Sequence, residues 1–336
     1  MGRRVGALVS AIAVVLAMAI AEPQAAFAEV PSPTVVEVPY DVGLHSHPMW
    51  DPWFDIDAFG YEANEYFVSG TATPTGEGDP ADYTTRIIVV HPSDPADFAG
   101  TVMLDWVNVT AQFENPVNSL TSVRYLLREG WAWVHVSAQA AGICCTPLTP
   151  QVYDAVRYAD LSHPGDEYAN DMFSQIAKAF QEPGEVDPMR GLDVEVIIAA
   201  GQSQSANRLT DYVKTTQADA GMIDAFLIQA EGDKVYDQDP TARVMHVLGE
   251  REGDPEEPTV WPNYVLWEIA GAAHADSWIG RQQTEGQSTR LAGAGRQPRE
   301  MAEALWRSAG NMGARAWTRA RTSAWSTGRC SPRGSR

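Results

Sequence analysis

The sequence predicts an α/β domain with a mostly parallel central sheet, antiparallel strands at its N-terminal end and helices on both faces. Three observations lead to this prediction. Strand-like and helix-like segments alternate along most of the chain. Several strand-like segments are almost continuously apolar, as expected for parallel strands that are covered on both faces. The first strand-like segments, in contrast, follow one another without helices between them, which favours antiparallel neighbours.

The predicted strands are short runs rich in β-branched and aromatic residues, bounded by Gly, Pro or Asp. They occupy residues 34–39, 64–72, 84–90, 100–107, 131–137, 194–200, 224–230, 243–248 and 263–269. Helices are expected over 118–128, 168–180 and 206–216, because apolar residues recur there at the spacing of one helix face. Leu120, Val123 and Leu127 form one such stripe.

Composition excludes several classes of protein. The 336 residues are enough to bury a sizeable core, and 44% hydrophobic residues are too many for a disordered chain. The chain carries 24 Lys and Arg against 44 Asp and Glu, a net charge of −20. Because such a chain repels phosphate backbones, we expect no nucleic-acid partner.

The two ends differ from the body of the chain. Residues 1–28 have the anatomy of an export signal: Arg3 and Arg4 precede an apolar stretch that ends at Ala26-Phe27-Ala28. We therefore expect cleavage after Ala28, a secreted protein, and no stable membrane insertion once the signal is removed. The catalytic domain is expected over 29–312. Residues 313–336 are basic and lack Val, Ile, Leu, Asp, Glu and Lys, which indicates a disordered tail or a shifted reading frame.

The strongest local signal lies where the strand at 194–200 runs into the helix at 206–216 through Gly201, Ser203 and Ser205. A nucleophilic serine in a sharp strand-to-helix turn needs small residues two positions before and after it, and the helix N-terminus favours developing negative charge. Ser203 meets both conditions, with a serine in place of the usual second glycine. Choosing Ser205 instead fits worse, and a helix-capping serine is the structural alternative.

A serine hydroxyl becomes a good nucleophile when a nearby base accepts its proton. Two of the seven histidines follow Ser203 in the chain. His246 lies inside an apolar strand and is expected to be a structural histidine. His274 follows the last predicted strand in a loop of small residues, so we expect it to be the general base.

A carboxylate must hold that base in place, and in this chain order it should lie just beyond the strand at 243–248. Three acidic residues do so. Glu250 is nearest to the strand end and is our first choice, with Glu252 and Asp254 as alternatives. At least two of the three are expected to be solvated loop charges.

Acyl transfer also requires two N–H donors for the oxygen that becomes negative in the tetrahedral intermediate. One is expected from the backbone of Gln204, directly after the nucleophile. The other is expected from Asn108 or Val109, in the loop after the strand at 100–107. Trp106, Gln204 and the loop at 139–150 are the first candidates for pocket residues.

At these residues the chain resembles the bacterial "alpha/beta hydrolase domain" proteins of the α/β-hydrolase superfamily, over about residues 34–310. The matching segments are residues 60–61, 65–70, 104–110, 162–166, 171–175, 201–206 and 267–276. The resemblance implies the α/β-hydrolase fold, Ser203 as nucleophile, His274 as base, an acid near Glu250, esterase-like chemistry and no cofactor. We thus expect a secreted serine hydrolase that cleaves a small-molecule carboxylic ester through an acyl-serine intermediate.

Other functions remain open at this point. The same fold can serve a non-catalytic binding protein, and the same triad can serve an acyltransferase. A metal enzyme would draw on His45-Ser46-His47 with Asp51 or Asp55, but the spacing is not helical and a third ligand is lacking, so we expect no metal. The eleven tryptophans are scattered, which favours packing over carbohydrate binding.

The adjacent cysteines Cys144 and Cys145 follow the strand at 131–137, and Cys330 is distant from them. Adjacent cysteines can close a ring or remain separate thiols, and the sequence favours neither. The oligomeric state is likewise open.

Overall fold

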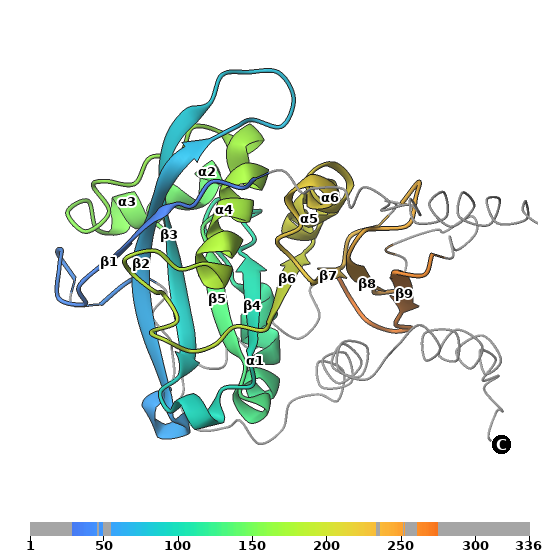
Figure 1. Ribbon diagram of the computed structural model, residues 1–336, viewed down its shortest axis with the longest axis horizontal. Coiled ribbons are helices and arrows are strands. Elements are labelled where there is room, and N and C mark those ends of the chain that lie inside the picture. The colour runs from blue at the N-terminus through green and yellow to red at the C-terminus, as the bar shows by residue number, and fades with distance from the viewer. Residues whose placement is uncertain are drawn as a thin grey trace, which may run out of the picture.

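The computed structural model describes residues 29–45, 47–49, 55–232, 236–250, 252 and 261–274. Within them, one nine-stranded sheet runs through the molecule, with helices packed on both faces (Figure 1). The strands are β1 (Thr34–Glu37), β2 (Tyr61–Ala72), β3 (Ala81–Pro92), β4 (Thr101–Trp106), β5 (Ala132–Val136), β6 (Val196–Gln202), β7 (Ala225–Gln229), β8 (Arg243–Leu248) and β9 (Tyr264–Glu268). Each corresponds to one predicted strand.

The order of the strands across the sheet is β1-β2-β3-β5-β4-β6-β7-β8-β9. The pairs β1–β2, β2–β3 and β3–β5 are antiparallel, and all pairs from β5–β4 to β8–β9 are parallel. The predicted antiparallel N-terminal strands beside a parallel sheet are therefore confirmed. Because parallel strands point the same way, the loops that follow β4, β6, β8 and β9 leave the sheet at one edge.

The three longer helices are those that the apolar stripes predict: α1 (Val117–Glu129), α4 (Ala169–Gln181) and α5 (Gln204–Thr215). Single-turn helices were not predicted, because so short a segment leaves no periodic pattern. They are α2 (Ala140–Ile143), α3 (Pro150–Tyr153), α6 (Gln217–Ala220) and 3₁₀ turns at Asp57–Phe59, Pro95–Asp97 and Asp166–Tyr168.

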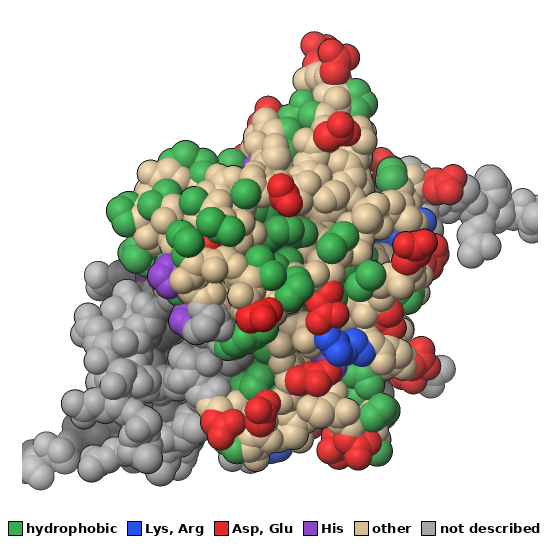
Figure 2. Space-filling model, turned by 90° about the vertical axis from the view of Figure 1, so that its left-hand side faces the viewer, with side chains coloured by type: hydrophobic (Ala, Val, Ile, Leu, Met, Phe, Trp, Pro, Cys, Tyr) green, Lys and Arg blue, Asp and Glu red, His purple; other side chains and the backbone are tan. Residues whose placement is uncertain are grey.

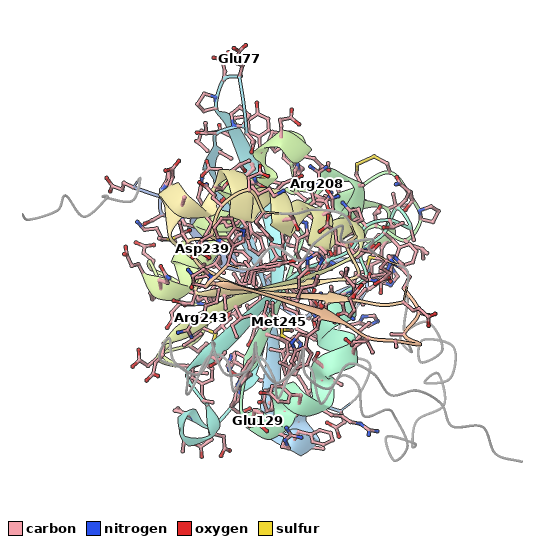
Figure 3. The ribbon with its side chains drawn as sticks, turned by 90° about the vertical axis from the view of Figure 1, so that its right-hand side faces the viewer. Glu77, Glu129, Arg208, Asp239, Arg243 and Met245 are labelled. Atoms are coloured by element: carbon pink, nitrogen blue, oxygen red, sulfur yellow. A yellow bond between two sulfur atoms is a disulfide. The ribbon has the colours of Figure 1, made fainter. Side chains whose placement is uncertain are left out.

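Each face of the sheet has its own apolar core. Figure 3 views the sheet edge-on, with α5 on one side and α1 on the other. On the α5 side, the ring of Phe173 lies 4.8 Å from that of Trp106 and 5.7 Å from that of Tyr212. On the α1 side, Trp133 and Met245 belong to the second core. These cores hold the ends of β4 and β6, where two loops of the candidate site begin.

The surface reflects the acidic composition. Figure 2 shows acidic side chains spread over one face of the molecule, with Lys and Arg at far fewer places. No helix among the described residues combines the length and apolarity that crossing a membrane requires. The expected export signal at 1–28 and the basic tail at 313–336 lie outside the described residues.

Candidate active site

Ser203 occupies a sharp turn between β6 and α5. Its backbone angles, φ 57° and ψ −117°, are rare for a residue with a side chain, and such a conformation costs roughly 1–3 kcal/mol. Neighbouring backbone groups hold it in place: the Ser203 N–H donates to the Gln229 carbonyl at 2.8 Å, and the Ser203 carbonyl accepts from the Asn207 N–H at 2.9 Å. The first turn of α5 directly follows, so the positive end of its dipole faces this turn.

The small residues of the turn are required by close contacts. A Cβ added to Gly201 would lie 2.8 Å from the backbone carbonyl group of Ser205, so a larger residue does not fit. Ser205 is fully buried, and its hydroxyl donates to the Gln202 carbonyl at 3.0 Å and accepts from the Gln202 N–H at 2.9 Å. Ser205 therefore stabilises the turn and is not accessible to a substrate.

His274 lies directly beside the serine. Its Nε2 is 2.7 Å from the Ser203 Oγ. The His274 carbonyl accepts a hydrogen bond from the Gln202 side chain at 3.0 Å, which ties the loop after β9 to the end of β6. The imidazole is 56% exposed, so a substrate can reach it.

The carboxylate that contacts His274 belongs to Glu252 and not to Glu250, our first choice. Glu252 Oε1 lies 2.6 Å from His274 Nδ1, and its Oε2 accepts from the Gly249 N–H. Glu250 is exposed and accepts from the Gly271 N–H at 2.9 Å instead. The Glu250 N–H bonds to the Ala272 carbonyl, which joins the loop after β8 to the loop after β9.

The third candidate acid, Asp254, lies outside the described residues. Glu252 therefore completes a chain of hydrogen bonds from hydroxyl to imidazole to carboxylate. This is the arrangement in which an imidazole can take a proton from a serine while a carboxylate stabilises the resulting positive charge. The Glu252 carboxylate is 9% exposed, so solvent screens this contact less than it would at the surface.

The expected N–H donors differ in availability. The Gln204 N–H is the first of α5, and an α-helix leaves such a group without an intrahelical acceptor. The Asn108 N–H is occupied, because it bonds to the Asn115 carbonyl at 2.9 Å. The Val109 N–H meets the Gln204 side-chain oxygen at a long 3.4 Å. Val109, rather than Asn108, is thus the loop residue with a donor that a substrate oxygen can take.

Asn108 positions the loop instead of donating from its backbone. Its side-chain Nδ2 donates to the Gln202 carbonyl at 2.8 Å, directly before Ser203. Its backbone forms a two-way bridge with Asn115, which closes the loop that carries Val109. The sequence predicted Asn108 as a possible backbone donor and could not distinguish that role from the side-chain contact seen here.

A buried ion pair fixes the same loop from the sheet side. Glu114 contacts the guanidinium of Arg86, a fully buried residue of β3 that also bonds Glu65 at 3.2 Å. Removing one member of a buried pair typically costs about 3–5 kcal/mol, because the other charge is left unpaired. Sequence reasoning missed this pair, although an arginine just before the apolar run Ile87–Val90 was a signal for a buried charge.

The remaining predicted residues lie apart from this cluster. His246 is buried and contacts the Tyr264 hydroxyl at 2.9 Å and the Glu231 carbonyl, in keeping with a structural role. His45 and His47 contact backbone carbonyls of Tyr153 and Pro48. Among the described residues no group of three possible ligands could hold a metal ion, and Asp51 lies outside them.

Trp106 and the adjacent cysteines were expected to be neighbours of the site. Trp106 is fully buried and packs against Phe173 in the core, so it does not line the site. Cys144 and Cys145 form a disulfide with each other, visible as a yellow bond in Figure 3. It follows α2, whose Gly142 packs against the Val109 side chain.

A family model described as "Alpha/beta hydrolase domain" matches residues 36–332, which is most of the chain. No curated protein matches this chain. Among solved structures, XC6422 from Xanthomonas campestris, described as an a/b serine hydrolase without lid, is 15% identical, with 65% of this chain and 91% of that chain covered and a TM-score of 0.39.

Two further structures give similar values. An alpha-beta serine hydrolase homologue from Coxiella burnetii is 10% identical, with 72% of this chain and 96% of that chain covered and a TM-score of 0.41. Est1E from Butyrivibrio proteoclasticus, solved with ferulic acid bound, is 11% identical, with coverage of 66% and 93% and a TM-score of 0.39.

Proposed function

Because the chain belongs to the alpha/beta hydrolase domain family, we propose that it is a serine hydrolase that cleaves a carboxylic ester through an acyl-Ser203 intermediate. One observation carries the proposal: the hydrogen-bonded series from Ser203 Oγ through His274 to Glu252, with distances of 2.7 and 2.6 Å. A serine that only capped a helix would need neither partner.

In the acylation step, the Ser203 oxygen attacks the ester carbonyl carbon while His274 Nε2 takes the hydroxyl proton. The carbonyl π electrons move onto the oxygen, which the N–H groups of Gln204 and Val109 stabilise as it becomes negative. The tetrahedral intermediate then collapses, the bond to the alkoxy group breaks, and His274 returns the proton to the departing alcohol.

In the deacylation step, water takes the place of the alcohol. His274 removes a proton from the water as its oxygen attacks the acyl carbon, and the same two N–H groups stabilise the second oxyanion. The intermediate releases the carboxylic acid, and Ser203 regains its proton from His274. Glu252 keeps the imidazole in the required tautomer and stabilises its charged form in both steps.

A labelling experiment with an assay tests this function. A fluorophosphonate probe should label the wild-type protein, and a panel of aryl esters should be hydrolysed. Ser203→Ala should lose both, with a fold-change in kcat of at least about 10³. Ser69→Ala, which removes a serine hydroxyl from β2, is the matched control and should retain both.

The outcomes separate the competing functions. A folded wild-type protein that is neither labelled nor active would contradict the proposal and favour a binding protein. Labelling together with transfer of the acyl group to an added alcohol in preference to water would indicate an acyltransferase. Both measurements need thermal unfolding curves of each variant, so that loss of folding is recognised.

We also propose that the protein is exported and that residues 1–28 are its signal. The support is the sequence itself, with Arg3 and Arg4 before an apolar stretch and small residues at Ala26 and Ala28. Expression in a bacterial host should yield extracytoplasmic protein that begins at Glu29 by N-terminal sequencing. Retention of the full N-terminus in the cytoplasm would contradict this.

A further inference from the structure

The side chain of Gln139 lies at the centre of a buried chain of hydrogen bonds beside the proposed active site. Gln139 directly precedes α2 and is 2% exposed. Its Oε1 accepts from Trp106 Nε1 at 3.1 Å and from Gln204 Nε2 at 2.9 Å. Its Nε2 donates to Asp166 Oδ2 at 2.9 Å. Every polar atom of this amide therefore has a partner of the opposite kind.

The direction of this amide is fixed by the chemistry of its partners. The indole N–H of Trp106 can only donate, and the ionised carboxylate of Asp166 can only accept. Rotating the Gln139 amide by 180° would therefore place donor against donor and acceptor against acceptor. Asp166 also accepts from the Arg208 guanidinium at 2.7 Å and from the Ala140 N–H at 3.0 Å. Arg208 lies on the α5 side of the sheet (Figure 3).

The fixed amide determines the direction of the next one. Because Gln139 presents oxygen, Gln204 must turn its NH2 group toward it and its own oxygen toward the Val109 N–H. Gln204 thus joins the two halves of the proposed oxyanion hole, since its backbone N–H is one donor and its side chain contacts the other. At 3.4 Å this last bond is long and weak, so a substrate oxygen can replace it at little cost.

We infer that Gln139 is a positioning residue of the oxyanion hole, which acts through the Gln204 side chain to orient the Val109 N–H relative to Ser203 before a substrate oxygen takes this donor. The inference rests on the proposed function. It follows from the hydrogen bonds of Gln139 to Trp106 and Asp166. These two partners allow only one orientation of the Gln139 amide, and that orientation in turn sets the orientation of the Gln204 amide.

Replacing Gln139 by glutamate tests directly whether the side chain at position 139 must donate to Asp166. When protonated, the introduced carboxyl can donate to Asp166 and accept from Trp106 and Gln204, as the amide does. When ionised, it cannot donate and faces another carboxylate, so the anchor is lost. Burial and the Asp166 charge should raise the pKa of the introduced carboxyl above the usual 4.3 or so of glutamate.

Three other charged or titratable groups near position 139 bear on the pKa of the introduced carboxyl. Arg208 lies behind Asp166 and partly offsets its charge. His163 contacts the Ala138 carbonyl at 3.1 Å, and burial lowers its pKa, so it is neutral at pH 7. Glu114, which packs against α2, is paired with Arg86.

The expected result is a new descending limb in the pH profile of kcat for Gln139→Glu. Activity should approach the wild-type value at the acid end and fall about tenfold as pH rises through the pKa of the introduced carboxyl, with KM changing by less than about twofold. Gln139→Met, which has no titratable group, should lose about tenfold in kcat at every pH. Loss of a whole oxyanion donor costs about 10²–10³, so displacing one should cost less.

Gln175→Glu is a matched control. Gln175 is also fully buried, accepts from the Tyr83 hydroxyl at 3.0 Å and donates to the Asp171 carboxylate at 3.3 Å, but it anchors the β2–β3 hairpin. The same chemical change there should alter the free energy of unfolding and leave the shape of the pH profile of kcat unchanged.

The outcomes are distinct. If wild-type protein fails to hydrolyse esters, the proposed function fails and this inference fails with it. If wild-type protein is active but Gln139→Glu lacks the descending limb, or Gln139→Met keeps kcat within about twofold, only the inference is overturned. Should Gln139→Met not fold, the decision rests on Gln139→Glu, which is measured first at the acid end where its bonds are restored.

Discussion

Glu250 and Glu252 are separated by one residue, yet only Glu252 contacts His274. We expect Glu252→Gln to lower kcat by about 10²–10⁴, because an amide no longer stabilises the charged imidazole and can hold it in the wrong tautomer. Glu250→Gln is the control and should stay within about threefold of wild type, since a glutamine oxygen can still accept from the Gly271 N–H. Steady-state kinetics on one aryl ester decides between them, and equal losses would contradict the assignment.

The sequence could limit the acid to three residues but could not choose among them. Distance along the chain from the end of β8 favoured Glu250. The choice depends on how the loop after β8 folds against the loop after β9, and here the Glu250 N–H bonds to the Ala272 carbonyl while the Glu250 side chain accepts from the Gly271 N–H. Such a contact joins residues that are far apart in sequence and leaves no local pattern. The small residues around Ser203, in contrast, form a local pattern, because a sharp strand-to-helix turn requires them.

A buried carboxyl next to the site predicts a pH dependence of stability. Burial raises the pKa of Asp105 to about 6, although hydrogen bonds from Ser119 and Asn118 oppose this. In the unfolded chain its pKa is about 3.9, so between about pH 4 and 6 the folded form holds a proton that the unfolded form has lost. The contribution of Asp105 to stability is therefore present below about pH 4 and is lost as pH rises to about 6.

Asp105→Asn should remove this dependence. The new oxygen can accept from the Ser119 N–H and hydroxyl, and a rotated Asn118 amide can accept from the new NH2 group. Relative to wild type, the free energy of unfolding of the variant should rise by on the order of 3 kcal/mol between pH 4 and 6, as two pKa units imply. Urea unfolding at a series of pH values measures this. Parallel curves for the two proteins would contradict it.

At the scale of elements, the predicted α/β-hydrolase fold is confirmed, and its strands and long helices were predictable because their patterns are local. The continuous apolar runs gave β5, β6 and β7, and the stripe that includes Leu120 gave α1. What the sequence missed are segments of one turn, such as α2 and α3, whose conformation depends on contacts with other loops. Gln139 and Gly142 belong to the loop at 139–150, which the sequence placed near the pocket without predicting its helical turns.

The α2 turn packs directly on the loop that carries Val109. A Cβ on Gly142 would lie 2.8 Å from Glu114 Cγ and 3.0 Å from Val109 Cγ1. Gly→Ala in a helix normally stabilises by about 0.5–1 kcal/mol, but here the added methyl group must displace the loop. We expect Gly142→Ala to lower kcat by about tenfold and to lower the melting temperature.

Gly184→Ala is the control for this change, because a Cβ there would meet no atom within 4 Å. It should leave kcat unchanged and should not lower the melting temperature. Kinetics and thermal unfolding of both variants are the measurements. Wild-type kcat in Gly142→Ala would show that α2 can move without moving the Val109 N–H, and the proposed coupling between these elements would be wrong.

At the scale of the whole molecule, the net charge of −20 sets which substrates approach easily. Acidic side chains are spread over the face seen in Figure 2, and the exposed Glu250 accepts from the Gly271 N–H, in the loop that carries His274. A field of one sign repels ligands of the same sign over about one Debye length, which is about 30 Å at 0.01 M salt and about 3 Å at 1 M. The charge therefore disfavours anionic esters at low salt, whatever the fit of the pocket.

An aryl acetate and the corresponding aryl hemisuccinate form a suitable pair, because they share a leaving group and differ in charge. As salt rises from about 0.01 to 0.5 M, kcat/KM for the anionic hemisuccinate should rise about 3- to 10-fold, whereas the value for the neutral acetate should stay nearly constant. If the ratio of the two values does not change with salt, the field of the whole molecule does not govern access. In that case charges at the site itself must set access, and Arg208, which pairs with Asp166, is one of them.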